Sequence, residues 1–243
     1  MTDACFLCDD VEAPIGALIR LDGPEGRHAA RVRRIRVGES LLLADGRGSA
    51  VRGVAQTIGD DHVDVLVQEH LYEPERPHRW TVVQALAKGG RDEAAIEAMT
   101  ELGVDAAVAW QADRSVVKWD GKTDKALAKW GAVVREAAKQ SRRFTVPPVR
   151  FATTTDVCAS LRSADQAFVL HESAGSYLDA EVLVSSGDVV FVVGPEGGIT
   201  EAELAAFEDA GAKPVLVADH VLRTSTAGVV ALAQLQVMSR GRD

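Results

Sequence analysis

Hydrophobic and polar residues alternate with a period of two through residues 40–71. The alternation runs through the segments LLLAD, SAVRGVAQTI and HVDVLVQEHL, which are separated by glycine-containing turns. In the last segment Val63, Val65 and Val67 fall on one side and mostly polar residues on the other, as in a half-buried antiparallel strand. The N-terminal part of the chain is therefore predicted to be a small β module.

The pattern changes after residues 74–78, where Pro74 and Pro77 interrupt any regular element. We place a domain boundary there, between residues 1–73 and residues 78–243. Beyond it, strands and helices alternate, and strands such as VVFVV are apolar on both faces, which is typical of a parallel sheet covered by helices on both faces. The predicted elements are a strand at 80–87, a helix at 92–102, a strand at 104–110, helices at 123–140 and 156–161, strands at 167–171 and 188–194, a helix from Thr200, a strand at 214–218 and a helix at 224–238.

The amino-acid composition limits the classes of protein to which this chain can belong. The 243 residues are 47% hydrophobic and 26% charged, as in a soluble globular protein, and no window approaches 18 uncharged apolar residues. The N-terminus has no basic segment ahead of an apolar stretch, so we expect a cytoplasmic protein without a membrane partner. Three cysteines (Cys5, Cys8 and Cys158) exclude a disulfide framework, and their spacing predicts no metal site. We assign these thiols no function.

The net charge of -9 hides a basic middle of the chain. Residues 76–150 carry 14 lysines and arginines against 9 acids, whereas the segments on either side are acidic. Two basic clusters suit a local grip on RNA phosphates, because each neutralised phosphate adds a salt-dependent contribution to affinity. The alternative is that these side chains line a solvated strand or helix face. The clusters consist of Arg27, His28, Arg31, Arg33, Arg34 and Arg36, and of Lys139, Arg142, Arg143 and Arg150 around Phe144.

The most informative segment is the glycine-rich turn at 194–198, GPEGG, which directly follows the apolar strand. Thr200 and Glu203 form a capping-box pattern, which predicts where the next helix begins. Glycines allow positive φ and close approach of a ligand, and ligands of open α/β sheets bind beyond the carboxyl ends of strands. No lysine follows as in a phosphate loop, and the spacing is not that of a dinucleotide fold. The alternative is a tight turn without a ligand.

A second segment, at 219–228, contains Arg223 among small hydroxyl residues at the start of the last predicted helix. Thr224, Ser225 or Thr226 can cap this helix, and Gly228 allows another segment to pack closely. The helix dipole disfavours an arginine at this end, so Arg223 needs a partner such as a carboxylate, a phosphate or a substrate carbonyl. The alternative is a surface salt bridge.

Together these segments carry a family resemblance. GPEGGITEAEL, followed about 25 residues later by VLRTSTAGVVAL, resembles the cofactor half of the SPOUT methyltransferases. With KGGR at 88–91 leading into AIEAMTELGV, and with REAAKQSRRFTVPPV, the chain resembles the ribosomal RNA small subunit methyltransferase E family, which methylates N3 of a uridine in 16S ribosomal RNA. The resemblance covers nearly the whole chain and includes a PUA-like, β-barrel RNA-binding domain at 1–73.

The resemblance implies a SPOUT-type parallel sheet with a deep trefoil knot, a homodimer, and S-adenosylmethionine (SAM) held in the knotted loops. The substrate would be 16S rRNA or the assembled small ribosomal subunit; the alternatives are another RNA base or tRNA, or a noncatalytic RNA-binding relative. The residues that it assigns to the cofactor are Leu170, His171, Glu172, Gly194, Pro195, Glu196, Gly197, Gly198, Val217, Val221, Leu222, Ser225 and Thr226. From the first basic cluster we assign Arg27, Arg31, Arg33 and Arg34 to RNA. Lys88, Arg91, Arg142 and Arg143 match basic positions of the family, and we assign them to RNA backbone or cofactor-side contacts.

For the implied chemistry, we assign Arg223 to the uracil oxygens, where it would stabilise the charge that develops as N3 loses its proton. Many family members have a glutamate where this chain has Ser225, so a carboxylate base at that position is not transferred. Glu172, Glu196 and a water molecule remain the candidates for the base.

Overall fold

The computed structural model describes residues 3–240. The chain divides into two compact units. The first consists of residues up to 75 together with residues 135–146, and the second of residues 76–134 together with residues from 147 onward. The sequence-derived boundaries at 73 and 78 did not include the segment 135–146 in the first unit.

The first unit contains a five-stranded sheet in the order β1-β3-β4-β5-β2. Strand β1 runs parallel to β3, and the other neighbours are antiparallel. The three strands predicted from period-two alternation are confirmed, and β1, β2, α1 and a following π-helical turn were not predicted. The bounds are β1 Ala4–Leu7, β2 Leu18–Leu21, α1 Gly23–Arg27, the π-helical turn His28–Val32, β3 Ser40–Ala44, β4 Ser49–Ile58 and β5 Val63–Tyr72.

The core of the first unit follows the predicted alternation. Val63, Val65 and Val67 are buried and pack with Phe6 and Leu41, whereas the intervening side chains of β5 are half-buried or exposed. Burial of one face therefore sets the register of β5 against its neighbours, because a shift by one residue would expose all three valines.

The second unit is built on a six-stranded sheet in the order β11-β9-β10-β6-β7-β8, and every pairing in it is parallel. This confirms the predicted parallel sheet. The strands are β6 His78–Ala85, β7 Ala106–Trp110, β8 Val149–Ala152, β9 Gln166–Leu170, β10 Gly187–Val193 and β11 Lys213–Val215. The helices are α2 Arg91–Leu102, α3 Thr123–Gln140, α4 Thr154–Ser163, α5 Glu201–Asp209 and α6 Thr224–Arg240, with a 3-10 turn at Leu178–Ala180.

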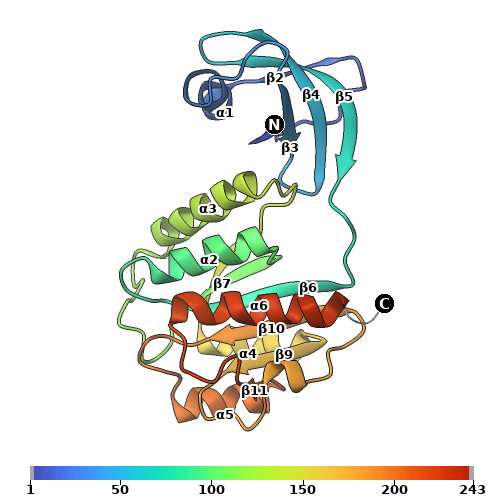
Figure 1. The fold of residues 1–243 in the computed structure, drawn as a ribbon. Helices are drawn as coiled ribbons and strands as arrows, with labels where there is room; N and C mark the ends of the chain where they lie inside the picture. Colours follow the sequence, from blue (N-terminus) through green and yellow to red (C-terminus); the bar gives the residue numbers. More distant parts are fainter. Residues whose placement is uncertain (1–2, 241–243) are drawn as a thin grey trace. The chain divides into compact units, whose positions relative to one another are not determined.

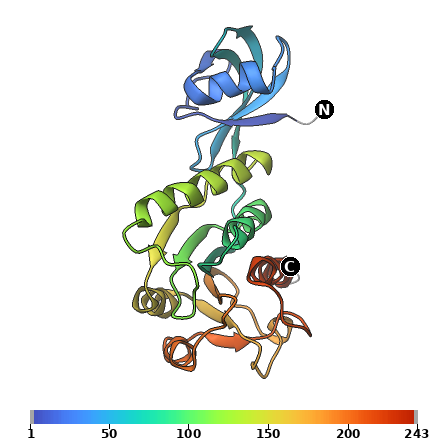
Figure 2. The same cartoon turned by 90° about the vertical axis from the view of Figure 1, so that its left-hand side faces the viewer.

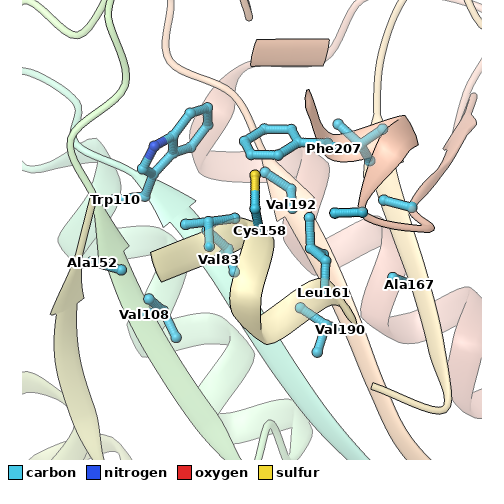
Figure 3. Packing of buried hydrophobic residues seen from close by; sticks show 14 of the residues in the cluster. Val83, Val108, Trp110, Ala152, Cys158, Leu161, Ala167, Val190, Val192 and Phe207 are labelled. Carbon is cyan, nitrogen blue, oxygen red and sulfur yellow. The ribbon is translucent and has the colours of Figure 1, made fainter. Parts of the chain in front are cut away.

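Helices cover both faces of this sheet, as predicted. Helices α2 and α6 lie side by side on one face, and α4 and α5 lie on the other (Figures 1 and 2). Under α4 and α5, the rings of Trp110 and Phe207 meet edge to face at 5.2 Å, beside Cys158 and Val192 (Figure 3). Gly228 of α6 packs where predicted: a Cβ there would lie 2.8 Å from Met99 Sδ, so the helices approach closely.

Because every strand of this sheet is parallel, all carboxyl ends lie at one edge. The loops that follow β6, β7, β9, β10 and β11 therefore share that edge. The loop after β6 and the loop after β11 both lie there, although they begin near residues 87 and 216 and are far apart in the chain. Among the described residues, no helix has the length and apolar character needed to cross a membrane.

The cysteines are free thiols. Burial is the largest cause that raises the pKa of Cys5, to about 11, so this thiol stays protonated at neutral pH and is a poor nucleophile. The structure gives no functional role to the CxxC segment.

Replacing Phe207 with Ala should lower the free energy of unfolding by about 3–5 kcal/mol, because the ring is completely buried and its loss leaves a cavity beside Trp110. Urea denaturation measures the change. Val182→Ala is the control, since that side chain is 79% exposed and its loss should change stability by no more than about 0.5 kcal/mol. Equal losses in the two variants would contradict the assigned core.

Candidate active site

Two adjoining hollows open at the carboxyl edge of the parallel sheet. The larger has a volume of about 480 Å³ and lies along the glycine-rich turn that follows β10. The smaller, of about 130 Å³, lies along residues 215–222 after β11. Both are lined by Leu170, Glu172, Val221, Leu222 and Ala227. Residues from the ends of β9, β10 and β11 and from the start of α6 thus line two neighbouring hollows.

The capping box predicted at the start of α5 is present. The Thr200 Oγ1 accepts a hydrogen bond from the Glu203 N–H, and the Glu203 carboxylate accepts one from the Thr200 N–H at 2.9 Å. The same carboxylate accepts the Asp113 N–H at 2.8 Å. Glu203 is almost fully buried, and these hydrogen bonds hold the loop after β7 against the start of α5.

The three glycines of the turn serve different purposes. Only Gly198 has a positive φ, of +75°, a conformation that other residues rarely adopt. At position 194 a Cβ would lie 2.8 Å from Ile199 Cγ1, and at position 197 it would lie 3.0 Å from the Arg114 carbonyl oxygen. Both positions therefore have room only for glycine. The expectation of positive φ therefore applies to one of the three, and the other two allow neighbouring chain to pack against the turn.

Arg91 and Glu196 form an ion pair at the rim of the larger hollow, with Arg91 Nη1 2.9 Å from Glu196 Oε1. Burial alone would raise the pKa of Glu196. The backbone N–H groups of Glu196 and Lys88 and the Arg91 guanidinium outweigh that effect and lower its pKa. Glu196 therefore remains a carboxylate that binds Arg91 and braces the turn.

Arg223 lines the larger hollow and is exposed. Among the described residues it forms no ion pair and no side-chain hydrogen bond. It directly precedes α6, and its carbonyl accepts the N–H groups of Thr226 and Ala227. A cation at this helix end is electrostatically unfavourable without a partner, so its guanidinium is available to an anionic or carbonyl ligand.

Thr224 joins the turn to the start of α6. Its buried hydroxyl donates to the Gly194 carbonyl at 2.8 Å and accepts from Gln84 Nε2 at 2.9 Å. Thr224 was considered as a helix cap, but its side chain instead bridges β6 and the glycine-rich turn. This contact sets where Arg223, its neighbour in the chain, enters the hollow.

The basic clusters of the first unit meet at a separate cavity of about 80 Å³. It is lined by His28 and Arg33 from the first cluster and by Lys139 and Arg142 from the second. Lys139 forms ion pairs with Glu25 at 2.9 Å and with Glu136 at 2.7 Å. The positive charge that the cavity presents to solvent therefore comes from the exposed Arg33 and Arg142. Arg34 and Arg142 have φ values of 53° and 56°, which non-glycine residues adopt rarely.

Comparison with known proteins places these sites in a family. The sequence model of an RNA methyltransferase domain matches residues 74–236, and that of an RNA methyltransferase PUA domain matches residues 21–68. The ribosomal RNA small subunit methyltransferase E of Mycobacterium bovis is 45% identical over 94% of this chain and 89% of its own length. The chain belongs to the ribosomal RNA small subunit methyltransferase E family.

A second curated relative and two solved structures are also similar to the chain. The Bacillus subtilis member is 31% identical over 88% of each chain. A crystal structure of the Neisseria gonorrhoeae member bound to SAM superimposes with a TM-score of 0.86, at 26% identity and 98% coverage of both chains. A Legionella pneumophila protein solved with bound SAM also gives a TM-score of 0.86, at 25% identity and 98% coverage of both chains.

Most of the residues that the sequence assigned to the cofactor lie around the two hollows. The smaller is lined by His171 and Val217, and the larger by the whole turn from Gly194 to Gly198 and by Arg223. Ser225 and Thr226 line neither hollow.

The residues assigned to RNA are divided between the two units. In the second unit, Lys88 is exposed and Arg91 is paired with Glu196. In the first unit, Arg27, Arg31, Arg33, Arg34 and Arg142 are exposed, whereas Arg143 is buried.

Sequence reasoning missed three residues that shape the site: Gln84, Ala227 and Arg114. Gln84 had a signal, because it is a polar residue inside the otherwise apolar segment WTVVQALA. Arg114 Nη1 donates to the Gly197 carbonyl at 3.3 Å, from a loop without a recognisable motif.

Replacing Thr224 with Val, which matches its shape, should lower the free energy of unfolding by about 1–3 kcal/mol and weaken SAM binding. The buried Gln84 amide and Gly194 carbonyl would both lose the hydroxyl. Urea denaturation and calorimetric titration with SAM measure the two effects. Thr224→Ser keeps the hydroxyl and should retain most of the stability and most of the affinity for SAM. If the Val and Ser variants show equal losses, the hydroxyl does not hold the site.

Proposed function

We propose that the protein is a SAM-dependent methyltransferase that methylates N3 of a uridine in 16S ribosomal RNA. The observation that carries the proposal is the unpaired Arg223 in the hollow of the glycine-rich turn, in a chain of the ribosomal RNA small subunit methyltransferase E family. A 16S rRNA substrate would place the protein with ribosomes in the cytoplasm.

The residues at the carboxyl edge fit SAM. The hollows combine apolar surface from Val193, Ile199 and Leu222 with exposed backbone of the glycine turn. Such a lining suits a ligand with a flat apolar base and a polar amino-acid end. When bound, SAM supplies an electrophilic methyl group. The protein's part is to hold the two reactants in line and to exclude water from them.

Arg223 is assigned to the uracil oxygens. Uracil N3 is an imide nitrogen between two carbonyl groups, and its negative charge spreads onto both oxygens when the proton leaves. A guanidinium donor aimed at those oxygens stabilises the charge as it forms. Arg223 has no competing partner among the described residues, so no protein contact must break before it binds substrate.

The cavity of the first unit supports a grip on RNA away from the reacting base. Arg33 and Arg142 come from segments more than 100 residues apart and line the same small cavity. Two exposed guanidinium groups around a cavity suit backbone phosphates, to which arginine forms forked hydrogen bonds. We assign Arg33, Arg34 and Arg142 to rRNA contacts, whether the substrate is free RNA or the assembled small subunit.

A homodimer and a trefoil knot are further parts of the proposal, taken from the family. Exposed apolar side chains support a second copy along this part of the chain: Val221, three residues before α6, is 82% exposed, and Val237, in the last turn of α6, is 67% exposed. Sedimentation equilibrium would test the dimer directly.

Arg223→Ala should lower the single-turnover rate of methyl transfer to small subunits by at least about 100-fold, because one preorganised donor to the developing charge is lost. Transfer of tritium from labelled SAM measures the rate. Arg79→Ala is the control: Arg79 is an exposed arginine of the same unit that pairs with Asp188 at 2.6 Å, at the amino ends of β6 and β10. A wild-type rate in Arg223→Ala would contradict its role.

Arg33→Glu combined with Arg34→Glu should weaken RNA binding and leave SAM binding unchanged. Each lost phosphate contact should also flatten the dependence of log affinity on log salt by about 0.7–0.9. Filter binding at several salt concentrations measures both. The control, Arg162→Glu with Arg240→Glu, makes the same charge change at exposed positions of the second unit. Unchanged RNA affinity at moderate salt in the first variant would refute the assignment.

A further inference from the structure

We infer that the Glu172 carboxylate is the general base that removes the proton from uracil N3. The inference rests on the proposed function and names the residue that the reaction still lacks. A base for N3 must lie in the same hollow as Arg223, because N3 is flanked by the two oxygens that Arg223 is assigned to bind. Among the described residues, the carboxylates that line this hollow are Glu172 and Glu196.

Glu196 is unsuited to the task. Its Oε1 is 2.9 Å from Arg91 Nη1, and backbone N–H groups donate to its carboxylate. If the Glu196 carboxylate accepted a proton, its ion pair with Arg91 would be lost, and with it a contact that holds the turn. The next carboxylate along the edge, Asp219, lines only the smaller hollow, and its Oδ1 accepts the Tyr177 hydroxyl at 2.8 Å.

Glu172 has the opposite surroundings. It is exposed and has no hydrogen bond or ion pair among the described residues, so its oxygens are available. It lines both hollows, at the junction between them. An atom in the Cβ position of Gly198 would lie 4.0 Å from Glu172 Oε1, so the carboxylate lies close to the last residue of the glycine-rich turn.

The backbone explains how Glu172 reaches this position. It follows β9 by two residues, and the glycine-rich turn follows β10, which pairs with β9 in parallel (Val192 opposite Val169). The two adjacent strands therefore deliver the carboxylate and the turn to the same edge of the sheet. Gly198 has no Cβ, so no side chain fills the space between them.

The step balances. Glu172 takes the N3 proton, and the N3 electron pair forms the bond to the methyl carbon while Arg223 holds the charge on the uracil oxygens. The bond from that carbon to sulfur breaks and its electron pair stays on sulfur, which becomes a neutral thioether. Glu172, now a carboxylic acid, returns its proton to water once the products leave.

Glu172→Gln tests the inference, because glutamine keeps the shape and removes the basic oxygen. We expect the single-turnover rate on small subunits to fall by at least about 100-fold. Calorimetric affinity for SAM should stay within about threefold of wild type. Glu172→Asp should recover part of the rate. Glu201→Gln is the matched control, since Glu201 is an exposed glutamate in the first turn of α5 that lines neither hollow, and it should keep the wild-type rate.

Chemical rescue separates a base from a residue that merely binds SAM. In subunits whose target uridine is replaced by 5-fluorouridine, N3 is more acidic and needs less help to lose its proton. Glu172→Gln should recover much of its lost rate on this substrate, whereas Thr224→Val should not.

Three results would overturn the inference: a wild-type rate in Glu172→Gln, a loss that matches a loss of SAM affinity, or no rescue by the fluorinated substrate. Failure of the proposed function looks different, because the wild-type protein itself would then form no N3-methyluridine.

Discussion

The Thr224 hydroxyl donates to the Gly194 carbonyl and accepts from the Gln84 amide, and the geometry of the candidate active site depends on this buried bridge. Gln84 lies in β6, in the interior of the sheet; Gly194 begins the glycine-rich turn; Thr224 begins α6. The three are separated by 30 to 140 residues in the chain. A hydrogen bond in a dry interior is costly to lose, so the contact holds three distant segments in one arrangement.

Around this bridge, the parallel sheet determines which residues can meet. Parallel strands place all their carboxyl ends at one edge, so the loops after β9, β10 and β11 line neighbouring hollows without any further device. The turn is narrow because Ile199 and the backbone at Arg114 pack against Gly194 and Gly197. Glu203, which caps α5 and also holds the Asp113 N–H, fixes the loop after β7 beside it. Among the described residues that line the larger hollow, Glu172 and Arg223 are the charged side chains without a hydrogen bond or ion pair, so both are available to a substrate.

The local sequence pattern was sufficient to predict the longer helices and strands. Helix α3 spans the predicted residues 123–140, and α5 begins at the predicted capping box, because amphipathic periodicity and cap chemistry are both written within a few residues. Strands β1, β2 and β8 were missed because their four-residue segments lack both a sustained alternation and a valine-rich run such as PVLVA at 214–218, which predicted β11. The inclusion of residues 135–146 in the first unit was also missed, because it depends on contacts with residues more than 60 positions away in the chain.

The candidate site was predictable in composition and not in detail. Motifs identified the glycine-rich turn and Arg223, but nothing local indicates that Glu196 is held by Arg91 while Glu172 is free of such a partner. That distinction decides which carboxylate can act as a base, and it arises only when β6, β9 and β10 bring their ends together.

The identity of the methylated nucleoside is the most direct test of the proposed reaction. Purified protein would be incubated with SAM carrying a deuterated methyl group and with small ribosomal subunits that lack the modification, and nucleosides from the 16S rRNA would be analysed by mass spectrometry. We expect deuterated N3-methyluridine at one position. Label on another nucleoside, or no label despite measurable SAM binding, would contradict the proposed reaction.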